Sequence, residues 1–362
     1  MVYLLSILVL GGLLGSLAIL LSVAESYLLD YGICIIDINS GERPIQVEGG
    51  RTLLSSLYDN QIFIPSACGG KGSCGHCKIT VTSGGGPVLP TERPYLSRWE
   101  IRSAVRLACQ VKVRQDISVR IPEEFLNIQL FTAVVENTRE LTYDIKEIKL
   151  RLKKPAEITY QPGQYVQIEA PSPEGPIFRA YSISSATSAS NVVELVVRLV
   201  PGGIASSYLH NLSMGDEVIF TGPYGEFRLN EDPSVELVCV GGGCGMAPIR
   251  NIIYSLYEKW PNRSCRLFFG CRTRRDVFYI EQFEQLQQKR PNFQVVYALS
   301  EAHGDKQWTG ERGFIHLAVD KYLETGPKRQ AFLCGPPLMI QVVTTVLKEK
   351  GVDPEDIFYD EF

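Results

Sequence analysis

Hydrophobic and polar positions form four successive patterns along the chain. The first is an unbroken apolar run. Val2 to Ala24 holds 23 residues without a charge. As a helix this run would span about 35 Å at ~1.5 Å per residue, enough to cross the core of a bilayer. A cleaved signal peptide is the alternative, but its apolar core is shorter and follows basic residues, and no Lys or Arg precedes Arg43. The pattern favours a retained transmembrane anchor over residues 1–26.

The second pattern, which follows the apolar run, predicts short strands and short helices. "YGICIIDINSG" alternates as a strand followed by a turn, and "HCKITVTSGGG" and "VKVRQDISVRI" contain further strands. Residues 51–61 predict one helix and residues 95–106 a second. Pro122 follows the last strand and marks a boundary, so we expect an α+β domain over residues 31–123.

The rest of the chain divides into two domains where the pattern of apolar and polar residues changes again. Residues 131–229 read as strands separated by turn residues, with one short helix near Ile204, which is typical of an antiparallel barrel. After "NEDPS", apolar strands alternate with predicted helices near 248–258, 280–288, 314–322 and 337–350. That alternation indicates a parallel α/β sheet. We expect the two domains to span residues 128–231 and 233–362.

Composition narrows the setting of this multidomain fold. The chain is 45% hydrophobic and 21% charged, as expected of a folded protein, and its net charge of −4 disfavours a nucleic-acid partner. Ten cysteines would allow disulfides in an exported protein. Their grouping, with three on one glycine-rich loop and others in apolar strands, instead favours metal ligation and buried thiols in a reducing compartment.

The strongest chemical signal is the cysteine spacing in "ACGGKGSCGHCKI". Three thiols lie close together at Cys68, Cys74 and Cys77, and a fourth, Cys109, follows after 31 residues. Four thiolates suit zinc or an iron–sulfur cluster. A zinc ribbon pairs two tight Cys-x-x-Cys knuckles and only one is present, so the spacing favours a [2Fe–2S] cluster. His76 fits a surface residue beside that cluster.

Two segments of the predicted barrel carry binding chemistry. In "RAYSISS", Arg179 offers a fork for a pyrophosphate, Tyr181 a ring to stack on a flat heterocycle, and Ser182 a hydroxyl to hydrogen-bond it. In "PGGIASSYL" a glycine pair meets the start of a helix, which favours phosphate binding. An ordinary strand end is the alternative for "RAYS" taken alone.

The α/β domain opens with a strand, a glycine loop and a helix in "VELVCVGGGCGMAPIR". This order is the physical context of a dinucleotide pyrophosphate site, although the spacing is not the usual G-x-G-x-x-G. Arg272, Arg274 and Arg275 follow the second strand, where they could favour a 2′-phosphate or form a solvated basic turn. Cys334 lies at the carboxyl edge of the sheet, where it could line a nicotinamide pocket or be a buried structural cysteine.

Taken together, "RAYS", "GGGCGMAP" and "CGPP" resemble, in order and spacing, the ferredoxin–NADP reductase superfamily fused to a [2Fe–2S] ferredoxin. With "SACGGKGSCGHC", "RLACQV", "PTE", "WTGERGFIH" and "YDEF", the whole chain more closely resembles the family of F-subunits of the Na+-translocating NADH:quinone oxidoreductases. The resemblance implies a transmembrane helix, a β-grasp ferredoxin domain, an FAD-binding β-barrel and a Rossmann-like NAD domain.

That resemblance also implies the function. Hydride would pass from NADH to FAD, and single electrons would then pass through the [2Fe–2S] cluster to partner membrane subunits of a Na+-pumping ubiquinone reductase. The protein would be a single-pass flavoprotein of a bacterial inner membrane, with its cofactor domains in the cytoplasm. The family has a basic turn at "CRTRRD" as well, so the resemblance favours NADH over NADPH.

Site residues carry over from the family by motif. Cys68, Cys74, Cys77 and Cys109 would ligate the cluster, and Ser182 and Cys334 would be catalytic, Ser182 near the reactive nitrogen of the flavin. The FAD site would comprise Arg179, Tyr181, Ser182, Gly203, Ser206 and Phe362. The NADH site would comprise Gly242, Gly243, Gly245, Met246, Cys334 and Gly335.

This sequence departs from the family pattern at three places. Cys244 stands where the glycine loop usually has Ala, Phe362 is the last residue where glycines usually follow, and "EAPSPEGPIFRAYS" is shorter than the corresponding segment. Two alternatives stay open. One is the NAD(P)H reductase component of a multicomponent monooxygenase, and the other is a redox-sensing or electron-carrier module without NADH turnover.

Overall fold

The computed structural model describes residues 10–20, 31–173, 175–225, 229–302 and 304–361, and the chain divides into two compact units, Met1–Ile128 and Gln129–Phe362. Of the predicted anchor, residues 10–20 are helical, and the rest lies outside the described residues. Within the described part of the chain, no helix is long and apolar enough to cross a membrane.

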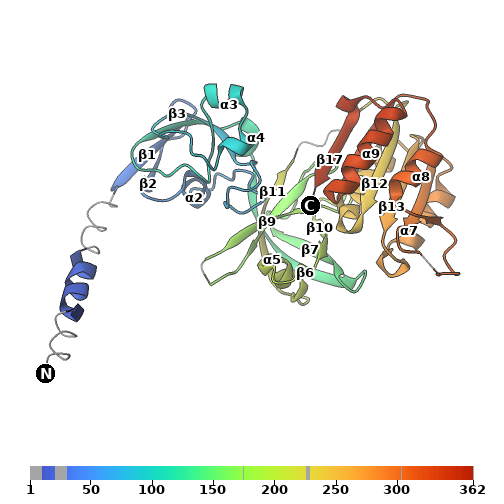
Figure 1. Ribbon diagram of the computed structural model, residues 1–362, viewed down its shortest axis with the longest axis horizontal. Helices are drawn as coiled ribbons and strands as arrows, with labels where there is room; N and C mark the ends of the chain where they lie inside the picture. Colours follow the sequence, from blue (N-terminus) through green and yellow to red (C-terminus); the bar gives the residue numbers. More distant parts are fainter. Residues whose placement is uncertain (1–9, 21–30, 174, 226–228, 303, 362) are drawn as a thin grey trace. The chain divides into compact units, whose positions relative to one another are not determined.

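The first unit is built around a five-stranded mixed sheet (Figure 1). Its strands lie in the order β2 (Ile45–Glu48), β1 (Ile33–Ile38), β5 (Ile117–Arg120), β3 (Lys78–Ser83) and β4 (Val105–Leu107). β1 and β5 run parallel, and the other neighbours are antiparallel. Alternate residues of β1, from Cys34 to Ile38, are buried and share one core with Leu53 and Leu57 of the helix α2 (Leu53–Asp59).

Capping and backbone geometry set the short helices of this unit. The Thr52 hydroxyl accepts a hydrogen bond from the Ser55 N–H, so α2 begins later than the predicted helix over 51–61. The predicted helix over 95–106 is wrong for most of its length. Ser97 and Glu100 form a capping box that starts α3 (Arg98–Arg102), and Ala104 has a φ of 57° that turns the chain into β4. The remaining short helices are η1 (Arg93–Tyr95) and α4 (Glu123–Leu126).

The second unit begins with six antiparallel strands, drawn mostly in green in Figure 1. They lie in the order β10 (Val192–Arg198), β7 (Ile145–Lys154), β6 (Gln129–Glu140), β11 (Glu217–Tyr224), β8 (Tyr165–Ala170) and β9 (Ile177–Ser182). An isolated antiparallel bridge between Ile183 and Leu195 joins the two ends of this order. The expected short helix is α5 (Ile204–His210).

The unit ends in a six-stranded sheet in which every neighbouring pair is parallel, as the alternating pattern predicts. The order is β15 (Glu311–Arg312), β14 (Phe293–Leu299), β13 (Cys265–Cys271), β12 (Glu236–Gly242), β16 (Arg329–Gly335) and β17 (Ile357–Glu361). The sequence reading did not predict β17 as a strand. The short helices η2 (Gly243–Gly245), η3 (Arg274–Asp276) and η4 (Pro354–Asp356) lie in its loops.

Alternate residues of the central strands point to opposite faces of this sheet. Cys239 of β12 joins the core formed with α6 (Met246–Lys259) and α7 (Ile280–Lys289), whereas Val240 joins the core formed with α8 (Ile315–Tyr322) and α9 (Pro337–Glu349). The sheet is therefore covered by helices on both sides, which explains why its strands read as continuous apolar runs. All four helices begin and end within two residues of their predicted limits.

Candidate functional site

The cysteine loop of the first unit is shaped by glycine. Gly69, Gly70, Gly72 and Gly75 all have positive φ, between 65° and 84°, a region that other residues rarely adopt. A Cβ on Gly72 would lie 2.6 Å from the Gln110 side-chain nitrogen. These conformations wrap the backbone tightly around the thiols.

The four predicted cluster ligands form two thiol pairs. A hydrogen bond with Cys74 and backbone N–H groups of Ser73 and Lys71 lower the pKa of Cys68 to about 4. A hydrogen bond with Cys77 likewise lowers the pKa of Cys109 to about 7. In each pair, the partner's pKa is raised by the same hydrogen bond and by burial.

Two pairs of thiols with backbone N–H donors to sulfur match the chemistry of a two-iron cluster. The pairs also interact with each other, because Cys109 lies within electrostatic range of Cys68. Within the described ranges, no three His, Cys, Asp or Glu side chains group as ligands of one metal ion. His76 is exposed beside the loop.

Strand pairing brings the distant Cys109 to the loop. Lys78 of β3 pairs with Leu107 of β4, and the Ala108 N–H donates to the Cys77 carbonyl at 2.8 Å. The pairing thereby places Cys77 opposite Ala108, the residue before Cys109. Gln110 Nε2 donates to the Cys109 sulfur at 3.6 Å, a contact that the spacing of cysteines could not predict.

A buried ion pair supports the same strand. Glu92 is 0% exposed and Arg106 4% exposed, and the Arg106 Nη2 donates to the Glu92 carboxylate at 2.7 Å. Burial disfavours the charge of Glu92, but the guanidinium and the N–H groups of Leu89 and Leu107 outweigh it and lower the pKa of the carboxyl. The sequence reading used both residues only as family landmarks.

In the second unit, the glycine loop lies at the switch point of the parallel sheet. β12 has β13 on one side and β16 on the other, and open α/β sheets bind ligands at the carboxyl ends of such strands. Gly241 pairs with Cys334, so the loop that starts at Gly242 lies beside the end of β16. A Cβ on Gly335 would lie 2.7 Å from the Met339 side chain, so only glycine fits there without rearrangement.

Not every predicted residue of this loop presents its side chain. Met246 is 0% exposed and packs beneath Gly241, so its side chain belongs to the core. Gly243 has a φ of 58°, and a Cβ there would meet the guanidinium of Arg198, which reaches over from β10. Gly245 ends η2 and is buried.

Cys244 connects the two predicted halves of the site. Burial raises its pKa to about 11, and it lies within electrostatic range of Tyr181, on β9, and of Cys334. Burial also raises the pKa of Tyr181 to about 12, so the phenol stays neutral at ordinary pH. Cys334 is fully buried, and Asp360 of β17 lies within range of it. Tyr181 of "RAYS" and Cys334 of "CGPP" therefore both lie near Cys244.

The other predicted flavin residues lie around the same strand. Arg179 and Ser182 are half-buried on β9, and Arg179 Nη1 donates to the Phe178 carbonyl at 2.7 Å. The Ser206 hydroxyl accepts from the Val200 N–H at 3.1 Å and donates to the Gly203 carbonyl at 3.2 Å. Ser206 thus braces the loop before α5. Phe362 lies outside the described residues.

The basic turn after β13 is mostly neutralised. Arg272 pairs with Glu301 at 3.0 Å, and Arg274 pairs with Asp305 at 3.5 Å. Arg275 is exposed. Two of the three cations that could attract a 2′-phosphate therefore already have acidic partners.

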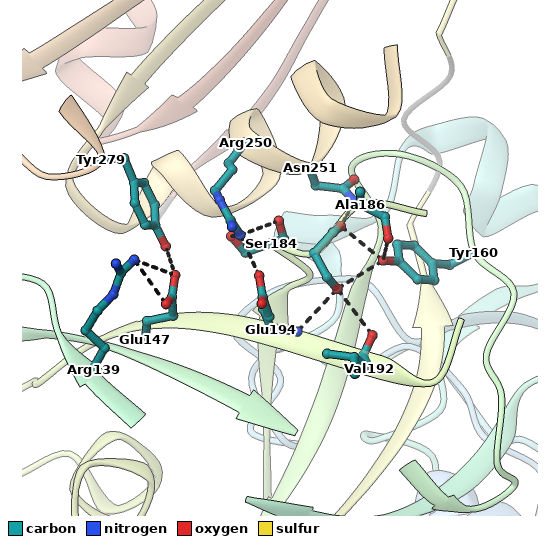
Figure 2. Close-up of polar contacts among 11 residues, drawn as sticks. Arg139, Glu147, Tyr160, Ser184, Ala186, Val192, Glu194, Arg250, Asn251 and Tyr279 are labelled. Atoms are coloured by element: carbon teal, nitrogen blue, oxygen red, sulfur yellow. Dashed lines mark hydrogen bonds and ion pairs between the residues drawn. The ribbon is translucent and has the colours of Figure 1, made fainter. Parts of the chain in front are cut away.

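Sequence reasoning missed a polar network between the antiparallel strands and the parallel sheet (Figure 2). Arg250 and Asn251 of α6 donate to the segment just after Ser182, and the Tyr279 hydroxyl donates to Glu147 of β7. The available signal was the pair of polar residues Asn251 and Ser255, four positions apart among the apolar residues of α6.

Comparison with known proteins agrees with the expected order of three domains. The chain matches family models of a 2Fe-2S iron-sulfur cluster binding domain over residues 36–114, an oxidoreductase FAD-binding domain over 132–229, and an oxidoreductase NAD-binding domain over 239–345.

Similar whole proteins are the F-subunits of Na(+)-translocating NADH-quinone reductases. That of Neisseria meningitidis serogroup C is 37% identical, with 96% of each chain covered, and that of Klebsiella pneumoniae is 35% identical, with 95% of each covered. The first alignment spans 390 positions, more than the 362 residues of this chain, so the relative carries residues that this chain lacks.

Similar solved structures are reductases. A cytochrome P450 reductase of Amycolatopsis has a TM-score of 0.72 and 29% identity, and the ferredoxin reductase of carbazole 1,9a-dioxygenase has a TM-score of 0.69 and 30% identity. Each covers 91% of this chain and 98% of its own.

Proposed function

Because this chain belongs to the family of F-subunits of the Na(+)-translocating NADH-quinone reductases, we propose that it is the NADH-oxidising component of such a complex. It would receive electrons from NADH and deliver them to membrane subunits that reduce ubiquinone and export Na+. When bound, FAD and the [2Fe–2S] cluster would convert a two-electron hydride into single electrons.

The roles of the residues follow from that proposal. Cys68, Cys74, Cys77 and Cys109 hold the cluster, within a domain over 31–123. Arg179, Tyr181, Ser182, Gly203, Ser206 and Phe362 hold FAD, in a barrel over 128–231. Gly242, Gly243, Gly245, Cys334, Gly335 and the main chain of Met246 hold NADH, in a domain over 233–362. Ser182 and Cys334 flank the reacting atoms, and residues 1–26 anchor the chain once in the membrane with the cofactor domains in the cytoplasm.

One observation carries the proposal most directly. Tyr181, from the predicted flavin segment, and Cys334, from the predicted nicotinamide segment, both lie within electrostatic range of Cys244 at the carboxyl edge of the parallel sheet. Hydride transfer needs two flat rings held in contact, and two segments that both lie near Cys244 support such a contact.

Anaerobic rapid mixing tests the proposal. Full-length protein with FAD and cluster bound should lose its flavin absorbance within milliseconds to seconds of mixing with NADH, and the paramagnetic signal of the reduced cluster should follow. Cys74→Ala should lose that signal and keep the flavin bleaching, because the first 128 residues form a separate compact unit. Absence of bleaching with both NADH and NADPH, or colourless protein that holds zinc, would refute the proposal.

A second candidate is the reductase component of a multicomponent monooxygenase. It is favoured by the likeness to the P450 reductase and to the dioxygenase ferredoxin reductase. Na+-stimulated ubiquinone reduction by the purified complex would exclude it, and electron delivery to an oxygenase without quinone reduction would support it. NADH turnover in either assay excludes a module that only senses redox state.

A further inference from the structure

Helix α6 joins the glycine loop to the segment that follows Ser182. The helix begins at Met246, directly after η2, so its position sets the position of the loop. Its face toward the antiparallel strands carries four polar residues, Arg250, Asn251, Ser255 and Glu258. Each of the four has a hydrogen-bond partner within residues 184–188.

Arg250 makes the central contact. One nitrogen, Nη1, donates to the Ser184 carbonyl at 3.0 Å, to the Ser184 hydroxyl at 3.2 Å, and to the Glu194 carboxylate of β10 at 2.6 Å. Its side chain is 13% exposed and that of Glu194 20% exposed, so the pair is largely shielded from water. Charge-assisted bonds of this kind are among the stronger ones in proteins.

The following residues extend the contact along the helix. Asn251 is fully buried; its side chain donates to the Ser185 carbonyl and accepts from the Gly163 N–H at 2.6 Å. One turn further on, the Ser255 hydroxyl accepts from the Thr187 N–H at 3.2 Å. Asn251 and Ser255 therefore both bind backbone groups of the segment after Ser182, and Asn251 also binds the backbone of Gly163.

A second group of side chains closes the same interface from α7 (Figure 2). Tyr279, the residue before α7, is 6% exposed, and its hydroxyl donates to Glu147, which also pairs with Arg139 at 3.1 Å. The Arg250 guanidinium lies 5.0 Å from the centre of the Tyr279 ring. Tyr279 holds this place with a φ of 61°, a conformation that a bulky residue rarely adopts. Local strain of this kind persists where tertiary contacts enforce it.

From this arrangement we propose that Arg250 and Asn251 are positioning residues for hydride transfer. Ser184 lies two residues after Ser182, and Arg250 lies five residues after Gly245, so one side chain couples the predicted flavin strand to the predicted nicotinamide loop. The pair sets the distance between the two rings and contacts neither. The inference rests on the function proposed above.

The test is pre-steady-state reduction of the Arg250→Met protein. Because a misplacement of about 1 Å can slow a reaction by about 100-fold, the limiting rate of flavin bleaching should fall by about 10- to 100-fold. The dissociation constant of NADH and the FAD content should stay close to wild type, since Arg250 touches neither. With deuteride in place of hydride on NADH, the isotope effect on the limiting rate should grow.

Arg250→Lys is the conservative partner of this variant. Only Nη1 makes the three bonds, and within the described residues Nε has no partner, so an ammonium with three donors can replace it. The lysine variant should recover most of the lost rate. Asn251→Ala should also lower the limiting rate of flavin bleaching. Lys259→Gln, on the exposed last turn of α6, is the matched control and should bleach at the wild-type rate.

A readout without turnover completes the test. Hydrogen exchange of the amides of residues 184–187 should be faster in Arg250→Met than in wild type and in the control. If Arg250→Met does not fold, Glu194→Gln removes the same charge pair and should slow bleaching and loosen the same amides. Wild-type limiting rates in these variants would overturn the inference, as would a loss of thermal stability alone. A wild-type protein that NADH does not bleach would instead contradict the proposed function.

Discussion

Glu92→Gln tests how the buried ion pair maintains the cluster-binding fold. All partners of the carboxylate are donors: one oxygen accepts from Arg106 Nε at 2.9 Å and the Leu107 N–H at 3.0 Å, and the other from Arg106 Nη2 at 2.7 Å and the Leu89 N–H at 2.8 Å. Glutamine keeps the shape but replaces one oxygen by NH2. In either orientation that NH2 faces two donors, so the variant gains a clash and loses a charge.

The magnitude follows from what Arg106 keeps. Removing one partner of a buried pair costs about 3–5 kcal/mol. Arg106 would still donate to the carbonyls of Gly85, Gly86 and Pro87 at 2.8 to 3.0 Å, so its charge is not wholly unpaired. We therefore expect the lower value, about 3 kcal/mol. With a urea slope of about 1–2 kcal/mol/M, the apparent midpoint should fall by roughly 1.5–3 M.

Visible circular dichroism of the cluster, followed in urea, measures this change in full-length protein. Flavin fluorescence reports on the second unit and should show an unchanged midpoint, because Glu92 belongs to the first. Asp59→Asn is the matched control, since Asp59 and its partner Arg51 have side chains 45% and 56% exposed. Exposed pairs contribute at most about 1 kcal/mol. A shift for Glu92→Gln no larger than that of Asp59→Asn would refute the reasoning.

The same pair predicts a pH dependence. Since the folded-state pKa of Glu92 is lowered, its stabilisation is complete above the unfolded pKa of about 4.3 and is lost as pH falls through the folded pKa. The stability gap between wild type and Glu92→Gln should therefore be constant from about pH 8 to 5 and narrow below about pH 4.3. A gap that narrows near neutral pH would point to another group.

Three further outcomes follow. Ser182→Ala should slow flavin bleaching by NADH with little change in FAD content. An unchanged rate would show that Ser182 does not lie beside the reacting atoms. Glu301→Gln should release Arg272 from its ion pair and raise the NADPH-to-NADH ratio of kcat/KM by about two- to fivefold, as expected for an exposed pair; an unaltered ratio would show that the turn does not meet the ribose. Gly72→Ala, at a φ of 72°, should push Gln110 away from Cys109 and accelerate loss of the cluster while the flavin stays bound, which the decay of visible absorbance measures.

The pattern of apolar and polar residues predicted the long helices and strands well because their burial is regular. The helices of the parallel sheet lie within two residues of expectation, and its strands are the continuous apolar runs expected of a sheet covered on both faces. The failures are short elements whose state depends on neighbours. β4 became a strand through its pairing with β3, and β17 through its pairing with β16, and neither pairing is visible in three to five residues of sequence.

The candidate site divides in the same way. Spacing alone was enough to group Cys68, Cys74 and Cys77, because they share one short loop. The pairing of Cys77 with Cys109 depends on the register of β3 and β4, which the sequence does not reveal. The position of Cys244 within electrostatic range of both Tyr181 and Cys334 depends in turn on the approach of two separate sheets.

The polar network on α6 shows where sequence reasoning could go further. "MAPIRNIIYSLYEK" buries residues around most of its circumference, and Asn251 and Ser255 are among them. A buried amide or hydroxyl needs a hydrogen-bond partner, and a helix satisfies its own backbone internally. Polar residues on such a helix therefore predict a second structural element packed against it, although they do not identify that element. Here it is the segment after Ser182, so the residues that least fit the apolar pattern of α6 are those that join it to the end of the predicted flavin strand.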